Sequence, residues 1–348
     1  MGFSTASLAV RRRKVNKVRI TPSIAILIAI GFLMTGCGGD RTGGSTGNDG
    51  SIHFEYLQSW QRHSVPVLQD PEPRGGFEVA ADPHVFRNQN GALHMIYTGP
   101  HPSNDYATIK LATASSYTDW TVDSVLLAGS NSGNLDLNKE TSFYRLADSG
   151  KHQIYYIGYE DENVYASQIF VAEADTLKGP YILPNNPIIP TGMQAEHEVV
   201  AMTSPSIVEY EEKLYMVYCA WDAFPNPTAV WVHGATSDDD GQTWDVVGEV
   251  LVPTCMEGSF TSGPDGFFYA VAQTGNGFTF SIGRSEQPFG PYDMLSDPVM
   301  TLAGVPWEVD EMNTPQLFFE GDTAYLYYTG ANYLKGWWTM LATADLAH

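Results

Sequence analysis

The chain has 348 residues, with 40 acidic and 18 basic side chains and a formal net charge of −22. This acidity argues against nucleic acid or another polyanion as a partner, because such ligands need a basic surface. Length alone would allow two or three ordinary domains, but similar units repeated along a chain can close into a single body.

The first 37 residues have the pattern of an export signal. Six basic residues between Arg11 and Arg19 precede an apolar run from Ile24 to Met34, which is too short for a comfortable membrane span. The sequence Thr35-Gly36-Cys37 then resembles the lipobox of bacterial lipoproteins. That resemblance implies cleavage before Cys37 and acylation of its thiol. The alternative is an ordinary signal anchor.

Residues 38–50, GGDRTGGSTGNDG, form a flexible Gly/Ser-rich tether with nothing to bury. We therefore expect an exported monomer, held by lipid at the cell surface or in the periplasm, that contacts the membrane only through its anchor. Two further cysteines, Cys219 and Cys255, follow in the domain of residues 51–348. An exported protein can form a bridge between them, and two separately buried thiols are the alternative.

Five copies of one hairpin pattern occur after the tether. They are ADPHVFRNQNGALHMIYTG from Ala81, ETSFYRLADSGKHQIYYIG from Glu140, SPSIVEYEEKLYMVYCA from Ser204, EGSFTSGPDGFFYAVAQTG from Glu257 and TPQLFFEGDTAYLYYTG from Thr314. Aligned on the first strand, Asp82, Glu140, Ser204, Glu257 and Thr314 form one column, with separations of 53 to 64 residues. Short alternating strands at this period predict an all-β, five-bladed β-propeller.

The closure of the ring follows from the two ends of the domain. Each of the first four repeats continues with a third strand and a fourth strand that opens on an aromatic residue: Trp120, Tyr181, Trp244 and Tyr292. The fifth repeat ends at His348 after its third strand. SWQRHSVPVLQ, with Trp60 in the opener's place, has the missing pattern, so we predict that this N-terminal strand completes the last blade and leaves no free sheet edge.

One turn, SDDDGQTW from Ser237 to Trp244, matches the Asp-box of propeller proteins. This motif fastens the fold and has no known need to touch substrate, so its aspartates receive no catalytic role. Three neighbouring carboxylates would also suit calcium, which is the only metal ion we consider for this chain. No cofactor is required for the expected chemistry.

In a propeller the first strands line the central channel, so the column converges on one mouth. The loops after the second strands, which are rich in polar and aromatic residues, surround it. Asp82 and Glu257 would face each other there, as cleavage of a glycosidic bond by an acid and a base requires, and Glu140 would tune its neighbour's pKa or hold a hydroxyl. The expected substrate-binding residues are His84, Glu198, Ser204, Trp221, Asp222, Gln273, Thr314 and Tyr333.

The ADPHVF hairpin, the EGS at Glu257 and the five-blade count resemble the arabinanase, levansucrase and invertase superfamily, and glycoside hydrolase family 43 most of all. The resemblance implies that Asp82 is the general base of an inverting mechanism and Glu257 the general acid. The family's third acid would start the third blade, where this chain has Ser204. Glu140, Glu196, Glu198 or Asp222 could replace it, or the chain could be a degenerate member.

The leading hypothesis is a glycoside hydrolase that acts on neutral plant or algal oligosaccharides, of the arabinofuranoside, xyloside or galactoside type. A non-catalytic carbohydrate-binding surface lipoprotein is the alternative, and Ser204 favours it. A glycoside phosphorylase ranks lower because phosphate needs cations at the mouth, where the sequence offers little beyond His84, His101 and Lys335.

Overall fold

The computed structural model describes residues 52–70, 77–101, 103, 106–160, 166–223, 227–250, 255–274 and 277–346. Their antiparallel sheets form the predicted five-bladed β-propeller. The predictions for the signal peptide, the tether and Cys37 fall outside these residues. No helix in this part of the chain has the length and apolar character needed to cross a membrane.

The first three blades follow the chain in order. Blade 1 contains β3 (Ala81–Arg87), β4 (Leu93–Pro100), β5 (Ala107–Ser116) and β6 (Asp119–Leu127). Blade 2 contains β7 (Asn138–Leu146), β8 (His152–Tyr159) and β9 (Gln168–Ala174), and its fourth strand is reduced to isolated bridges at Ile182 and Ile189. A hairpin of β10 (Gly192–Gln194) and β11 (His197–Val199) leads to blade 3, which contains β12 (Ala201–Tyr210), β13 (Lys213–Trp221), β14 (Val230–Ser237) and β15 (Asp245–Glu249).

Blades 4 and 5 complete the ring. Blade 4 contains β16 (Gly258–Ser262), β17 (Phe268–Thr274) and β18 (Thr279–Ser285), with the short strands β19 (Asp293–Met294) and β20 (Met300–Thr301) both paired to β18. Blade 5 contains β21 (Glu311–Glu320), β22 (Thr323–Asn332) and β23 (Gly336–Asp345), and β2 (Glu78–Val79) lies parallel to β23.

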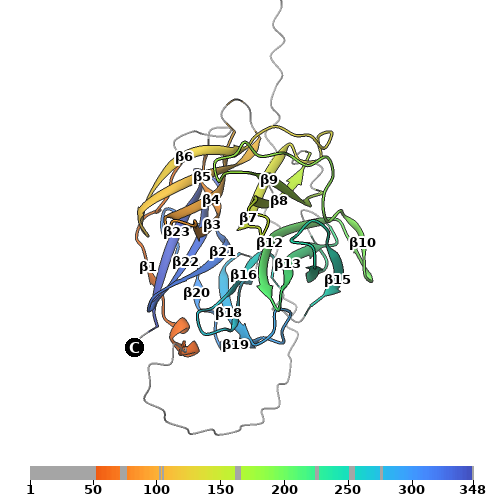
Figure 1. The fold of residues 1–348 in the computed structure, drawn as a ribbon. Coiled ribbons are helices and arrows are strands. Elements are labelled where there is room, and N and C mark those ends of the chain that lie inside the picture. Colours follow the sequence, from red (N-terminus) through yellow and green to blue (C-terminus); the bar gives the residue numbers. More distant parts are fainter. Residues whose placement is uncertain are drawn as a thin grey trace, which may run out of the picture. The chain divides into compact units, whose positions relative to one another are not determined.

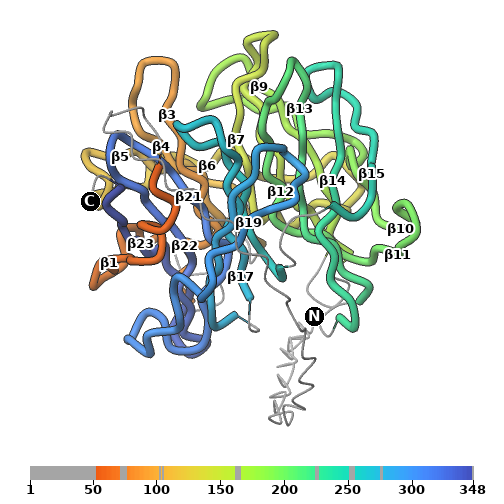
Figure 2. Tube along the Cα trace, turned by 90° about the horizontal axis from the view of Figure 1, so that it is seen from below, coloured from red at the N-terminus to blue at the C-terminus, as the bar shows by residue number. Residues whose placement is uncertain are grey.

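The N-terminal segment closes blade 5, as predicted. After the 3₁₀ helix η1 (Phe54–Gln58), β1 (Gln61–Arg62) pairs antiparallel with β23, so that Gln61 lies opposite Thr343. Figures 1 and 2 show this orange segment beside the blue C-terminal strand. The predicted aromatic openers share one contact, because the Nε1 or hydroxyl of each donates to a carbonyl three or four residues upstream: Trp60, Trp120, Tyr181, Trp244 and Tyr292.

The hydrophobic core lies between the blades. It consists of five clusters, and each cluster combines buried side chains of two neighbouring blades. Ile157 of blade 2 packs with Met202 and Met216 of blade 3 in this way. Because strand side chains alternate between two faces, every blade buries apolar residues on both sides and must be held between two others. Closure of the ring is therefore a condition of stability.

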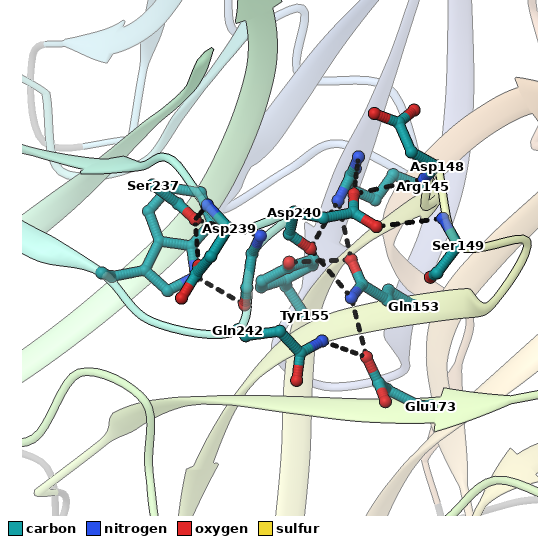
Figure 3. A network of polar contacts seen from close by, with 12 residues as sticks. Arg145, Asp148, Ser149, Gln153, Tyr155, Glu173, Ser237, Asp239, Asp240 and Gln242 are labelled. Atoms are coloured by element: carbon teal, nitrogen blue, oxygen red, sulfur yellow. Dashed lines mark hydrogen bonds and ion pairs between the residues drawn. The ribbon is translucent and has the colours of Figure 1, made fainter. Parts of the chain in front are cut away.

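The Asp-box turn stabilises the fold, as expected. Ser237 and Asp239 bind each other and the turn's own main-chain N–H groups, and Asp239 also accepts from the Thr243 hydroxyl. Asp240 reaches across to blade 2, where its carboxylate accepts from Arg145 Nη2 at 2.8 Å and from the main-chain N–H of Ser149 (Figure 3). This network joins blades 2 and 3 and engages Asp239 and Asp240, whereas Asp238 pairs with Lys213 at the surface.

A buried polar set recurs in four blades, and we call it the tyrosine anchor. A second-strand tyrosine donates its hydroxyl, at 2.8 Å in each case, to an acceptor in the segment that precedes its blade: Tyr97 to Asp70, Tyr156 to Asp136, Tyr218 to Gln194 and Tyr328 to Glu308. A basic or imidazole group binds each acceptor as well: Lys110, Lys139, His233 and Arg62 respectively.

In three of the tyrosine anchors a glycine lies two residues after the tyrosine. This produces the Tyr-x-Gly sequence that recurs in blades 1, 2 and 5. A Cβ at Gly99 would lie 3.1 Å from Asp70 Oδ2 and 2.5 Å from Lys110 Cδ. One at Gly158 would lie 2.6 Å from Asp136 Cβ. Glycine therefore makes room for the segment that carries the acceptor.

Candidate active site

The column predicted from the sequence is correct for three members and wrong for two. The first strands of blades 1, 2, 3 and 5 contain a β-bulge, and the bulged residue has a positive φ: Asp82 (53°), Thr141 (44°), Ser204 (55°) and Thr314 (44°). Glu140 is one residue before the bulge. β16 of blade 4 pairs without a register shift, and Glu257 lies just before it, opposite Gln273. The position of the bulge depends on strand pairing, which the sequence does not show, so the alignment put Glu140 in the column where Thr141 belongs.

Asp82 nevertheless lies where blade 1 contacts its two neighbours, blades 5 and 2. Its main-chain N–H donates to Thr329 Oγ1 at 2.8 Å, and the Thr141 N–H points to its Oδ2 at 3.4 Å. Burial raises the pKa of Asp82 above its usual value, partly offset by hydrogen bonds from Thr98, Thr314 and Thr141. A non-glycine residue at positive φ is a strained arrangement of the kind that functional sites hold.

Glu257 lies on the other side of Thr314. The Thr314 N–H donates to Glu257 Oε2 at 3.2 Å, and the Thr203 hydroxyl lies 3.5 Å from Oε1. Burial is the main cause that raises the pKa of Glu257 well above normal, and the charges of Asp82, Glu311 and Glu140 add to it in that order. The two predicted carboxylates are thus brought together around one residue of blade 5, and both side chains stay half-buried.

Glu311 is a further carboxylate of this site that the sequence analysis missed. Gln273 donates from Nε2 to Glu311 Oε1 at 3.2 Å, and the Tyr333 hydroxyl donates to Oε2 at 2.6 Å. Gly277, at φ +87°, packs against the Glu311 side chain. Burial raises the pKa of Glu311. The only signal in the sequence was an acid three residues before Thr314.

Glu140 contributes from blade 2, where the Tyr159 hydroxyl donates to its Oε1 at 2.7 Å. Its charge is the weakest of the three that raise the pKa of Glu257. Four carboxylates, from blades 1, 2, 4 and 5, therefore influence one another at this end of the channel, which we call the carboxylate end.

Gln273, Thr314 and Tyr333 lie at the carboxylate end as predicted, through the contacts above. Ser204 is buried at the bulge of blade 3, where its hydroxyl lies 3.4 Å from that of Thr203. His84 lines the channel wall, with its ring 4.3 Å from that of Phe143, and burial lowers its pKa to about 3. His84 is thus a neutral wall residue.

Three other predicted binding residues lie in different settings. Trp221 is only 7% exposed, so it offers no free face on which a sugar could stack. Asp222 accepts from the main-chain N–H groups of Thr228 and Ala229 and from the Thr228 hydroxyl, and that hydroxyl is the first cause that lowers its pKa. Asp222 therefore fastens its own loop. Glu198 is exposed on the hairpin before blade 3.

Two cavities lie next to each other in the channel. The small one is lined by Asp82, Thr141, Ser204 and Thr314 among others, and it shares His84 and Gln316 with a larger cavity of about 570 Å³. The large cavity is lined by the later residues of the first strands, including Phe86, Phe260 and Phe318. It therefore lies beyond His84, away from the acids. We place the chemistry at the carboxylate end, because no acid of the Asp82–Glu257 pair lines the large cavity.

Within the described residues, no group of three or more His, Cys, Asp or Glu side chains is arranged to hold a metal ion. This includes the Asp-box turn, whose carboxylates are engaged by Thr243, Arg145 and main-chain N–H groups.

Comparison with known proteins gives fold relatives only. No protein-family model and no curated protein matches the chain. A family 117 glycoside hydrolase of Zobellia galactanivorans is 18% identical, with a TM-score of 0.62 over 83% of this chain and 90% of its own. An α-L-arabinofuranosidase of Podospora anserina, solved with cellotriose, is 12% identical, with a TM-score of 0.60 over 83% and 98%.

A thermostable family 43 glycoside hydrolase is 12% identical, with a TM-score of 0.54 over 76% of this chain and 88% of its own. The predicted resemblance to propeller glycoside hydrolases is confirmed at the level of the fold, and its closeness to family 43 is approximate. A shared fold does not assign a reaction, so the argument for one has to come from the site.

Proposed function

We propose that this protein is an exported glycoside hydrolase that cleaves neutral plant or algal oligosaccharides by general acid/base catalysis with inversion. The observation that carries the proposal is the Asp82–Glu257 pair, two half-buried carboxylates on either side of Thr314. Burial raises the pKa of both, and the charge of Asp82 raises that of Glu257 further. A pair of carboxyl groups with separated pKa values supplies one acid and one base at the same pH.

The roles follow from the electrostatics. The charge of Asp82 raises the pKa of Glu257, so the pair favours an ionised Asp82 beside a protonated Glu257. Glu257 would donate its proton to the leaving glycosidic oxygen. Asp82 would accept a proton from the water that attacks the anomeric carbon. Thr314 orients Glu257, because its N–H donates to Oε2, and its hydroxyl helps to hold down the pKa of Asp82.

Glu311 would take the place of the missing acid of blade 3. Its two hydrogen bonds fix the carboxylate from both sides, and its charge is second only to that of Asp82 in raising the pKa of Glu257. We expect Glu311→Gln to lower the pKa of Glu257 and so to move the alkaline limb of the kcat/KM profile to lower pH. Glu140→Gln, which removes the weaker charge, should move it less. An equal or larger movement in Glu140→Gln would contradict this order.

The substrate class rests on charge and on the relatives. Four carboxylates at one end of the channel would repel an acidic sugar or a phosphate. Tyr333, 52% exposed and bound to Glu311, offers an aromatic surface beside them. The fold relatives include an arabinofuranosidase solved with a neutral oligosaccharide. The basic and apolar leader ending at Cys37 supports export and lipid anchoring, with a monomeric domain outside the membrane.

The test uses residues 51–348 on a panel of neutral glycosides and polysaccharides, with the variants Asp82→Asn and Glu257→Gln. Each variant should lose about 10²–10⁴-fold in kcat/KM on natural linkages. Glu257→Gln should lose far less on dinitrophenyl glycosides, because their leaving group needs no proton, whereas Asp82→Asn should lose similarly on both. Inversion would appear by NMR as a first product of opposite anomeric configuration.

A non-catalytic carbohydrate-binding lipoprotein is the second candidate, and the buried Ser204 in place of an acid favours it. A silent protein that binds oligosaccharides equally well with and without Glu257→Gln would establish that role instead. Activity that depends on added phosphate would identify a phosphorylase.

A further inference from the structure

Two buried thiols meet at the seam between blades 3 and 4. Cys219 Sγ, on β13, lies 3.0 Å from Cys255 Sγ, which is three residues before β16. Both side chains are buried, at 2% and 7% exposed, within the cluster of apolar residues that joins these two blades. The two cysteines are free thiols in the structure, and they lie in contact rather than buried separately.

Cys219 occupies a position on the second strand at which other blades make a contact with the next blade. It directly follows the tyrosine of the anchor in blade 3, Tyr218. The corresponding residues of blades 1 and 5 are Thr98 and Thr329, whose hydroxyls accept from main-chain N–H groups of the next blade, those of Thr141 and Asp82. Cys219 makes the same kind of contact with the next blade, but through sulfur.

The contact lies close to the proposed acid. Cys255 precedes Glu257 by two residues, and its Sγ packs against Gly258, where an added Cβ would lie 3.0 Å away. Thr203, which pairs with Cys219 in the sheet, is also the residue whose hydroxyl lies 3.5 Å from Glu257 Oε1. The segment that carries Glu257 therefore touches blade 3 twice, once through sulfur and once through a hydroxyl.

We propose that Cys219 and Cys255 are a disulfide-forming pair, and that the bond fastens the Glu257 segment to blade 3 in the exported protein. Two thiols lose two protons and two electrons as the S–S bond forms, and the oxidant is a protein or small-molecule disulfide that is reduced to two thiols. The hydrogen bond to Cys255 and burial raise the pKa of the Cys219 thiol, so Cys219 has little thiolate for exchange once the chain is folded. The bond is therefore expected to form during folding.

The test compares the full chain, with its leader, from an oxidising compartment with the same chain made in a reducing one. Each sample is denatured without reductant, treated with iodoacetamide, digested and examined by mass spectrometry. We expect one cross-linked peptide pair containing Cys219 and Cys255 from the oxidising compartment, and separate alkylated peptides for these two residues from the reducing one. Cys219→Ser and Cys255→Ser chains should each show an alkylated remaining cysteine.

A second measurement detects the structural effect. Reductant added during heating should lower the melting temperature of the oxidised wild type by about 5–10 °C and leave the double Ser variant unchanged. Full alkylation of both cysteines in the oxidised sample would overturn the proposal, as would a cross-link between separate chains. No substrate enters either measurement, so the result is independent of the proposed hydrolase activity.

Discussion

Blade 4 differs from the other four blades in how the segment before its first strand is bound. In blades 1, 2, 3 and 5 a tyrosine anchor binds that segment through buried hydrogen bonds and, in three of them, an ion pair. In blade 4 Val271 occupies the tyrosine position, opposite Ser259 in an unbulged ladder. Of the segment before β16, the structure describes Cys255 to Glu257, and Cys255 contacts blade 3 through sulfur.

The difference shows how a repeated fold accommodates a site. The four anchored blades contain the bulge and fix their part of the channel by buried polar bonds, and Asp82 belongs to that rigid frame. Glu257 comes from blade 4, where the described residues contain neither the bulge nor the tyrosine. Asp82, the proposed base, is therefore positioned by the repeat, and Glu257, the proposed acid, by a departure from it.

The largest loss of stability should come from removing the basic group of a tyrosine anchor. Lys110 Nζ lies 2.6 Å from Asp70 Oδ2, and both side chains are buried. Lys110→Met would leave the Asp70 carboxylate without its cation, which typically costs about 3–5 kcal/mol of the free energy of unfolding. Lys213→Met is the matched control, because the Lys213–Asp238 pair is largely exposed and should cost less than about 1 kcal/mol. Urea unfolding measures both, and equal losses would contradict the importance of the anchor.

A smaller difference in stability should separate an anchor with a charged acceptor from the anchor with a neutral one. Tyr156→Phe removes a hydrogen bond to the Asp136 carboxylate and should cost about 1.5–3 kcal/mol. Tyr218→Phe removes the same hydroxyl from Gln194, a neutral acceptor, and should cost about 0.5–1.5 kcal/mol. Both substitutions leave the ring in place. If the order in urea unfolding were reversed, the negative charge of the acceptor would not be what strengthens the anchor.

Most of the fold could be predicted from the sequence because its information is local and repeated. Alternating strands, turn residues and aromatic openers such as Trp60 recur at each blade, so the blade count and the closing strand followed directly. The Tyr-x-Gly pattern was visible too, but its meaning was not. Asp70 lies 27 residues before Tyr97 in the sequence, and nothing local marks the two as partners.

The site could be predicted only in part. Asp82 and Glu257 were found because each begins a repeat. Glu140 was placed in the column although the bulge of blade 2 is at Thr141, because the position of a bulge depends on pairing between strands that the sequence alone does not give. Glu311 was missed because its importance comes from Gln273 and Tyr333, which reach it from other strands. Trp221 was expected at the rim because aromatic residues often bind sugars, yet packing buried it.

The smallest predicted effect is the stability that the fold loses by holding Glu257, the proposed acid, at a raised pKa. Burial raises the folded-state pKa of Glu257 above the unfolded value of 4.5, so the folded chain binds more protons and loses stability as pH rises between these two values. Glu257→Gln removes this loss. The variant should match the wild type near pH 4 and melt about 1–4 °C higher above neutral pH. Melting curves across pH test this, with the exposed Glu286→Gln as the matched control. A stabilisation that shrank as pH rose would contradict a raised pKa for Glu257.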